Sequence, residues 1–360
     1  MNPLGQRIAQ LIEAQGPISI AQFMTMAAHD PVYGYYATRD PLGAEGDFVT
    51  APEISQMFGE LLGLWCVQAW REQDCPSPAR LVELGPGRGT LTADALHAAR
   101  LDPEFLASID VVLIETSAAL REQQAATLAL QEAGVSIRWL DRFDESLSDR
   151  PLFLLANEFF DALPIRQFVF TERGWCERMV GLDKDGALRF ALAPVATMLA
   201  IASERGLPEI GAVYETSPAA EAMVEQIADV IASKGGAALI VDYGYGADAG
   251  FGETLQAVAE HKFADVLDRP GEADLSAHVD FAALARAAEG AGAKVYGPVE
   301  QGAFLCSLGI VERAERLSRN HLQSTQTALD RLILPDAMGT LFKALAIVPE
   351  NAPTPPGFAA

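Results

Sequence analysis

The stretch LVELGPGRGT, which spans residues 81–90, decides the fold class of this chain. A short apolar run ends in three closely spaced glycines, Gly85, Gly87 and Gly89, and a helical pattern begins at Thr90. Glycines allow a tight turn and a close approach of the backbone to a ligand, and the free N–H groups at a helix start favour negative charge. A strand, a glycine-rich turn and a helix in this order predict the first unit of a doubly wound α/β fold.

The same alternation of apolar runs and helical patterns continues over residues 79–245, as expected for βαβ units and a parallel sheet. The runs do not alternate with polar residues, so we expect strands that helices cover on both faces. Strands are predicted at residues 80–84, 110–114, 136–140, 151–156 and 237–241. Helices are predicted at residues 90–99, 117–133, 218–232 and 280–290, and the apolar runs 293–296 and 341–348 are further candidate strands. The expected fold is Rossmann-like α/β with a mostly parallel central sheet.

Two segments look like additions to this core. Residues 166–194 alternate in period two and break at Arg173-Gly174 and at Asp185-Gly186, which predicts an inserted antiparallel β-meander. Its edge could pair with a second copy of the chain, so a homodimer is a candidate assembly. We expect an N-terminal helical and loop extension over residues 1–78 and a Rossmann-like domain over residues 79–360.

Charge and composition exclude several classes of partner. The chain of 360 residues carries 26 Lys and Arg against 49 Asp and Glu, a net charge of −23, with no basic cluster to attract nucleic acid or an anionic membrane. A basic partner would suit this charge, although many soluble proteins are acidic for colloidal reasons alone. The absence of a long apolar run and of a signal-peptide pattern predicts a cytoplasmic protein without membrane insertion. The four cysteines and five histidines show neither a disulfide framework nor metal-ligand spacing.

The spacing of the glycine turn indicates its cofactor. The dinucleotide fingerprint is G-x-G-x-x-G, whereas here the third glycine comes one residue early. The G-x-G-x-G form with a preceding acid is typical of S-adenosylmethionine (SAM) methyltransferases. Glu83 is expected near the amino acid end of SAM, unless a neighbour merely neutralises it. Glu115 could accept hydrogen bonds from both ribose hydroxyls or cap a helix, and Asp141 is a candidate for the adenine end. The predicted cofactor-binding residues are Glu83, Gly85, Pro86, Gly87, Gly89, Thr90, Leu91, Glu115 and Asp141.

A second polar cluster follows the fourth predicted strand, in ANEFFDALP at residues 156–164. Ligands of open parallel sheets bind beyond the carboxyl ends of the strands, so Asn157, Glu158 and Asp161 would face the reactive carbon of the cofactor. Methyl transfer depends on positioning the nucleophile. If the nucleophile is a guanidinium nitrogen, carboxylates can bind the cation and leave one nitrogen richer in electrons. The alternative is that these residues only cap the next helix, but capping accounts for one acid more readily than for all three residues.

These motifs resemble the MidA-like methyltransferases, whose mitochondrial member is a protein-arginine methyltransferase that acts in respiratory complex I assembly. The resemblance is carried by ELGPGRGTL (83–91), VLIETS (112–117), ANEFFDALP (156–164), DPVYGYY (30–36), GDFVTAPEISQMFGE (46–60), VDYGY (241–245) and RPGEADLSAHVDF (269–281). It covers almost the whole chain, and ANEFFDALP with GDFVTAPEIS is far more specific than the glycine turn.

The resemblance implies a SAM-dependent methyltransferase with the cofactor on the glycine turn and Glu115. It implies that Asp47, Thr50, Pro52 and Glu53 lie in a loop that covers the site, with Glu53 as a second carboxylate for a guanidinium. It also suggests a protein substrate methylated at arginine, with a respiratory complex subunit as candidate partner.

The roles of two further residues, and three alternative functions, are undecided from the sequence. Tyr36 could line the substrate mouth or anchor a loop, and His278 could form an acid–base pair with Asp280 or pack as a cap. The chain could instead be a SAM-binding assembly factor with little transferase activity, or a small-molecule methyltransferase. A nicotinamide-dependent oxidoreductase is a further alternative, against which the early third glycine argues.

Overall fold

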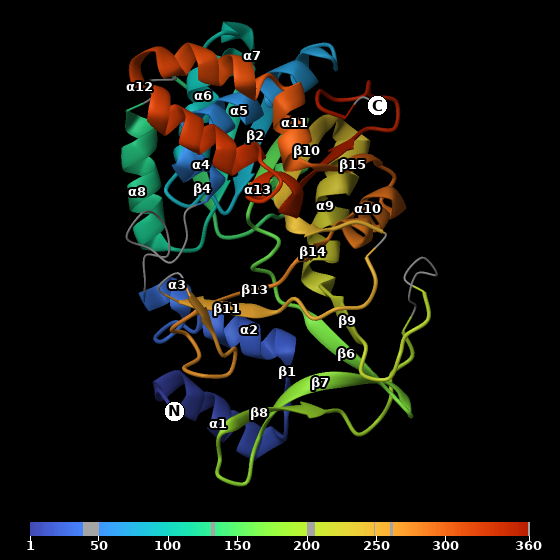
Figure 1. Cartoon of the computed structure of the whole chain (residues 1–360). Helices are drawn as coiled ribbons and strands as arrows, with labels where there is room; N and C mark the ends of the chain where they lie inside the picture. Colours follow the sequence, from blue (N-terminus) through green and yellow to red (C-terminus); the bar gives the residue numbers. More distant parts are fainter. Residues whose placement is uncertain (39–49, 131–133, 200–205, 248, 260–261, 359–360) are drawn as a thin grey trace. The chain divides into compact units, whose positions relative to one another are not determined.

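The turn of residues 85–89 joins strand β2 (Ala79–Leu84) to helix α6 (Thr90–Ala99) in the computed structural model of the chain (Figure 1). The structure describes residues 1–38, 50–130, 134–199, 206–247, 249–259 and 262–358. The chain forms two compact units, each discontinuous in sequence. The first comprises Met1–Phe48, Asp161–Glu221 and Tyr245–Asp280, and the second comprises Val49–Phe160, Ala222–Gly244 and Phe281–Ala360.

The second unit contains a Rossmann-like sheet with the strand order β15-β16-β10-β5-β2-β3-β4. Strands β10, β5, β2, β3 and β4 pair in parallel, whereas β16 is antiparallel to both β10 and β15. The further bounds are β3 (Ile109–Ile114), β4 (Ile137–Leu140), β5 (Leu152–Asn157), β10 (Gly236–Tyr245), β15 (Lys294–Glu300) and β16 (Phe342–Val348). The predicted fold class and each predicted strand are confirmed.

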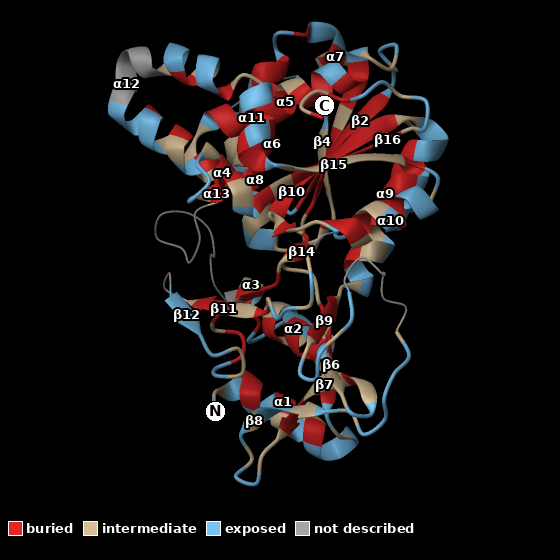
Figure 2. Ribbon diagram, turned by 45° about the vertical axis from the view of Figure 1, so that its right-hand side comes forward, coloured by how far each residue is buried: buried red, intermediate tan, exposed pale blue. Residues whose placement is uncertain are grey.

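Helices cover both faces of this sheet, and Figures 1 and 2 show α5 and α6 on one side with α9 and α10 on the other. Their bounds are α4 (Ala51–Ile54), α5 (Gln56–Arg71), α7 (Pro103–Ser108), α8 (Ala118–Ala129), the 3₁₀ turn η1 (Glu145–Leu147), α9 (Pro218–Lys234), α10 (Phe281–Gly290), α11 (Gln301–Ser307), α12 (Ile310–Ile333) and α13 (Met338–Leu341). Glycines let α5 cross α6 closely, because a Cβ at Gly63 would lie 2.5 Å from the Cα of Ala95. Strands β2, β3, β5, β10 and β16 are almost entirely buried (Figure 2), which explains their unbroken apolar runs, whereas β4 and β15 are only partly buried.

The first unit is built from antiparallel sheets and the first helices of the chain. One sheet has the order β1-β7-β6-β9 with β8 on β7, and a second has the order β12-β11-β13. The bounds are α1 (Pro3–Gln15), β1 (Ile18–Ser19), α2 (Ile20–His29), α3 (Tyr35–Thr38), β6 (Arg166–Thr171), β7 (Gly174–Leu182), β8 (Leu188–Leu192), β9 (Val213–Thr216), β11 (Gln256–Ala259), β12 (Lys262–Ala264), β13 (Asp274–Ser276) and β14 (Val279–Asp280). The predicted meander is confirmed as β6, β7 and β8, with its turns at the predicted glycines.

Within the described part of the chain, no helix is both long enough and apolar enough to span a membrane. The four cysteines are free thiols, and no group of His, Cys, Asp or Glu among the described residues could hold a metal ion. The role of residues 1–78 as a cover of the site stays a prediction.

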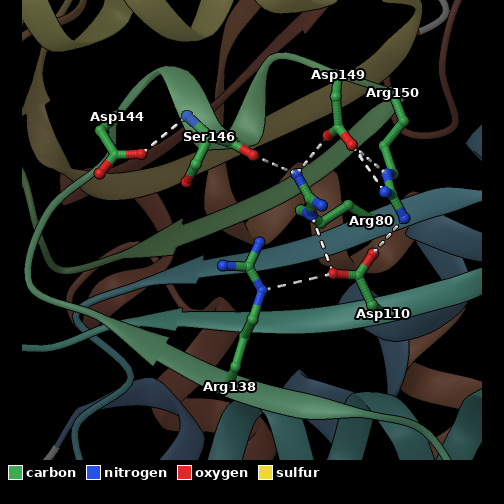
Figure 3. Close-up of polar contacts among 7 residues, drawn as sticks. All are labelled: Arg80, Asp110, Arg138, Asp144, Ser146, Asp149 and Arg150. Atoms are coloured by element: carbon green, nitrogen blue, oxygen red, sulfur yellow. Dashed lines mark hydrogen bonds and ion pairs between the residues drawn. The ribbon is translucent and has the colours of Figure 1, made fainter.

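An ion-pair network joins the amino ends of the central strands (Figure 3). The guanidinium of Arg80, whose side chain is 4% exposed, donates from Nε to Asp110 at 3.1 Å and from Nη1 to Asp149 at 2.9 Å. Arg80 Nη1 also donates to the carbonyl of Ser146 at 3.1 Å, and Arg150 contacts both acids. The network therefore ties β2, β3 and the segment before β5 together at the edge opposite the glycine turn.

Replacing Arg80 with Met should lower the free energy of unfolding by about 2 kcal/mol, because Asp110, Asp149 and the carbonyl of Ser146 lose a buried donor while both acids keep Arg150. The control is Arg138→Met, since Arg138 is 39% exposed and lies 3.8 Å from Asp110. This exposed pair should contribute less than about 1 kcal/mol. Urea unfolding measures both values, and equal losses in the two variants would contradict the interpretation.

Candidate active site

Parallel register gathers the predicted site residues of the second unit at one edge. Leu84 of β2 pairs with Ile114 of β3 and with Ala156 of β5, and Asn157 pairs with Val241 of β10. The residues that follow these strands therefore share the carboxyl edge of the sheet, where ligands of doubly wound folds bind. They are Gly85, Glu115 and Glu158, with Asp141 after β4 beside Glu115 and Asp242 still within β10, one residue beyond Val241.

The glycine turn needs its glycines for both conformation and space. Gly85, Gly87 and Gly89 have φ values of 59°, 52° and 81°, in the left-handed region that L side chains rarely adopt. A Cβ at Gly85 would lie 2.8 Å from Cδ2 of Phe159. Gly89 is the N-cap of α6, so the first N–H groups of that helix face the turn and Thr90 is its first residue. Within the chain, the N–H groups of Gly85 and Gly89 donate to the carbonyls of Ile114 and Pro86. The role of the turn in cofactor binding stays a prediction.

Glu83 lies inside the protein and is 4% exposed. The hydroxyl of Thr92, on α6, donates to its carboxylate, so Glu83 joins β2 to the helix after the turn. Burial raises the pKa of Glu83 to about 7, and the contact with Thr92 opposes that shift. Glu83 therefore retains its proton over part of the physiological pH range.

Glu115 and Asp141 are held by helix α8. The N–H of Ser117 donates to Glu115 Oε1 at 2.8 Å, and Gln124 Nε2 lies 3.3 Å from Glu115 Oε2. Burial raises the pKa of Glu115, and these hydrogen bonds oppose the shift. Arg121 donates to the carbonyl of Glu115 and pairs with Asp141 at 2.6 Å, with the Asp141 side chain 79% exposed.

The segment after β5 is held in an unusual conformation. Glu158 has φ 49°, which is uncommon for a residue with a side chain and typical of functional sites. Asp242 is fully buried, and its Oδ2 accepts the N–H groups of Phe159 at 3.1 Å and Phe160 at 2.9 Å. Asp242 thus fixes the backbone just after Glu158. Its position at the end of the fifth predicted strand makes Asp242 a pocket candidate from the sequence, but its contacts with the backbone of residues 159 and 160 could not be predicted there.

Asn157 ends β5 and is 8% exposed. Its Nδ2 donates to Glu158 Oε1 at 3.2 Å, and since a carboxylate only accepts, the amide orientation is set. Asn157 Oδ1 is buried and has no hydrogen-bond partner among the described residues. A buried acceptor without a partner costs about 1–3 kcal/mol, so this oxygen is suited to a ligand that donates.

Residues 50–54 are anchored at the same edge. The N–H of Ala51 donates to Glu158 Oε1 at 2.9 Å, and the Thr90 hydroxyl donates to Glu53 Oε1 at 2.5 Å. Thr50 is the N-cap of α4, and Pro52 is buried in its first turn. The structure therefore brings Thr50, Pro52 and Glu53 to the glycine turn and to β5.

Asp94 is a further acid beside this segment. Burial, together with Glu60 and Glu53, raises the pKa of Asp94 to about 7. Its Oδ2 is buried without a hydrogen-bond partner among the described residues, whereas both oxygens of Glu60 accept from Arg313 at 2.7 and 2.9 Å. Asp94 lies on the helix that follows the glycine turn, but nothing in its sequence context distinguishes it from an exposed helix acid.

The remaining predicted residues belong to the first unit or lie outside the described residues. The Tyr36 hydroxyl donates to Asp274 at 3.2 Å, and burial together with Asp274 and Asp161 raises its pKa well above the ordinary value. The N–H of His278 donates to Thr254 Oγ1 at 2.9 Å, and burial lowers the pKa of the His278 ring. Asp161 is 9% exposed in the same unit, and Asp47 lies outside the described residues. The site roles of these four residues stay predictions.

Comparison with known proteins adds a family to this geometry. A family model described as "Putative S-adenosyl-L-methionine-dependent methyltransferase" matches residues 61–299. The Rattus norvegicus "Protein arginine methyltransferase NDUFAF7, mitochondrial" is 39% identical over 98% of this chain and 85% of its own length. The Homo sapiens protein of the same name is 37% identical over 98% of this chain and 84% of its own length.

A solved structure shares the whole architecture. The Burkholderia thailandensis protein crystallised with S-adenosyl-homocysteine is 31% identical and superposes with a TM-score of 0.81 over 99% of this chain and 92% of that chain. Similarity at this level extends to the full described chain, the antiparallel additions included.

The buried carboxyl of Glu83 should make stability depend on pH. Its pKa of about 7 exceeds the ordinary value of 4.5, so the folded state retains a proton that the unfolded state releases. The free energy of unfolding should therefore fall between pH 4.5 and 7, by up to about 3 kcal/mol from this group. Glu83→Gln should flatten that decline, as measured by urea unfolding at several pH values. Asp94→Asn is the parallel variant, and an unchanged pH slope in Glu83→Gln would contradict the assignment.

Proposed function

The chain belongs to the MidA-like family of S-adenosyl-L-methionine-dependent methyltransferases, and from this premise we propose that it transfers the methyl group of SAM to an arginine side chain of a partner protein. Methyltransferase activity and SAM as cofactor follow from the family. The arginine acceptor and the protein partner are the finer part of the proposal, and the residues named below support it.

The carboxyl edge of the second unit fits the cofactor. A Cβ at position 85 would lie 2.8 Å from Phe159, so only glycine fits there, and the first N–H groups of α6 face the turn. Glu115 offers acceptors for two hydroxyls. We assign the glycine turn with Pro86, Thr90 and Leu91 to SAM, Glu115 to its ribose, Glu83 to its amino acid end and Asp141 to its adenine end. Bound SAM supplies a methyl group that its sulfonium activates.

The choice of a nitrogen as the methyl acceptor rests on the unsatisfied oxygen Oδ1 of Asn157. This buried oxygen has no hydrogen-bond partner among the described residues, and it lies beside the carboxylate of Glu158 at the carboxyl end of β5. A nitrogen nucleophile satisfies it, because an N–H group can donate to Asn157 while its lone pair faces the methyl group. An oxygen nucleophile would offer a single donor and no positive charge for Glu158.

A guanidinium suits the acids around this oxygen better than a neutral amine does. Glu158 accepts from Ala51 and Asn157, Glu53 accepts from Thr90, and an ionised carboxylate has about four acceptor sites on its two oxygens. Two carboxylates can bind a guanidinium through paired hydrogen bonds and orient one nitrogen toward the methyl donor. The curated relatives are named protein arginine methyltransferases, which supports the same acceptor. A respiratory complex subunit stays the candidate partner that the family resemblance suggests.

Cofactor binding is tested first. Gly85→Ala should weaken binding of S-adenosyl-homocysteine at least about tenfold, because the new Cβ meets Phe159 in a left-handed backbone. Gly186→Ala is the matched control, since Gly186 has φ 79° and a Cβ there would meet no atom within 4 Å. Isothermal titration calorimetry measures both affinities. Equal losses in the two variants would contradict the assigned turn.

Methyl transfer is tested with radiolabelled SAM and cell extract, with the labelled residue mapped by mass spectrometry. We expect label on arginine; label on lysine or on a small metabolite would overturn the acceptor. Asn157→Leu should lower transfer on the order of 100-fold, because the nucleophile loses its acceptor. The same variant should keep its affinity for S-adenosyl-homocysteine and unfold within about 1 kcal/mol of the parent, since it removes an unsatisfied buried oxygen.

A SAM-binding assembly factor with little transferase activity makes the opposite prediction. In that case partner maturation would fail in Gly85→Ala and persist in Asn157→Leu. Comparing the two variants in one maturation assay separates binding from chemistry.

A further inference from the structure

We propose that Gln124 and Trp139 are positioning residues for the cofactor site, and that they set the Glu115 carboxylate to receive a vicinal diol. The inference rests on the proposed role of Glu115 toward the ribose. Gln124 lies on α8 and is fully buried, and Trp139 lies on β4. Neither residue belongs to the glycine turn or to a strand end, and neither was a predicted site residue.

The Gln124 amide has a single possible orientation. The indole Nε1 of Trp139 only donates, and it lies 2.7 Å from Gln124 Oε1. The carbonyl of Gly87 only accepts, and it lies 2.7 Å from Gln124 Nε2. The second proton of Nε2 points to Glu115 Oε2 at 3.3 Å. One buried amide thus connects the glycine turn to the acid that follows β3, and Trp139 prevents it from flipping.

The same helix contacts the turn at close range. A Cβ at Gly89 would lie 3.3 Å from the Cα of Gln124, so α8 packs directly on the turn. One helical turn earlier, Arg121 donates from Nε to the carbonyl of Glu115 at 2.8 Å. The backbone and the side chain of Glu115 are therefore both held by α8, which also packs against the glycine turn.

These contacts fix the acceptors that Glu115 presents. An ionised carboxylate has about four lone-pair sites on two oxygens. One site of Oε1 is used by the N–H of Ser117 at 2.8 Å and one site of Oε2 by Gln124, and the N–H of Thr116 also contacts the carboxylate. The acceptor capacity that remains on the two oxygens lies in a plane that the two contacts set. This arrangement matches two neighbouring hydroxyls, each donating to its own oxygen.

The experiment compares S-adenosyl-homocysteine with its analogue that lacks the ribose 2′-hydroxyl, by calorimetry. Gln124→Leu removes the three hydrogen bonds of the amide at similar volume. Trp139→Phe removes the donor that orients the amide and keeps an aromatic ring at that position. Gln123→Leu is the control, because Gln123 is the exposed neighbouring glutamine on α8.

We expect Gln124→Leu to weaken binding of S-adenosyl-homocysteine about tenfold and to reduce the preference for it over the deoxy analogue. Trp139→Phe should shift both quantities in the same direction by about threefold. Gln123→Leu should leave both unchanged. If circular dichroism shows that Gln124→Leu does not fold, the binding measurements on Trp139→Phe alone test the proposal.

Two results would overturn the proposal. Affinity equal to that of the parent in Gln124→Leu and Trp139→Phe would show that the amide does not position the acid. An equal loss for both ligands would show that it supports the turn alone. Failure of the proposed function would look different, since the parent chain itself would then not bind S-adenosyl-homocysteine.

Discussion

Parallel pairing of β2 with β3 and β5 places Leu84, Ile114 and Ala156 in one row, and the candidate site of the second unit depends on this row. A shift of one residue in either pair would move Glu115 or Glu158 along the sheet relative to Gly85. The register is held from the opposite edge, where Arg80 joins the amino ends of β2 and β3 through Asp110. The ion pairs at the amino edge therefore help to fix the register on which the site at the carboxyl edge depends.

Buried side chains hold the backbone at the site edge, and they do so by accepting from or donating to main-chain groups. Asp242 accepts two N–H groups after Glu158, and Gln124 donates to the carbonyl of Gly87. Such contacts hold left-handed residues that would otherwise relax. Preorganisation of this kind favours methyl transfer, because an in-line displacement depends on the position of the nucleophile more than on acid or base strength.

The sequence predicted what local patterns encode. Unbroken apolar runs, the glycine turn and the period-two meander each yielded elements that the structure contains, since helix and strand formation at those places follows from neighbouring residues. The contacts that hold the site residues in place could not be predicted from the sequence. Gln124 is one of two adjacent glutamines in a helix, and only the fold shows that one is buried against Trp139 while the other is exposed. Asp94 is a similar case, and for Asp242 the strand-end position was readable from the sequence but its hydrogen bonds to the backbone of Phe159 and Phe160 were not.

The net charge of −23 bears on partners less than these local contacts do. Charges on the surface are screened over roughly 8 Å at physiological ionic strength, so most of the 49 acids exert little force within the site. The acids that can position a ligand are those whose oxygens accept hydrogen bonds from the chain, as Glu158 does from Ala51 and Asn157. In the proposed function, an acid held in this way would meet a guanidinium in a defined geometry. Selectivity for a planar, multiply donating cation would then come from fixed acceptors, and the net charge would disfavour polyanions such as nucleic acid.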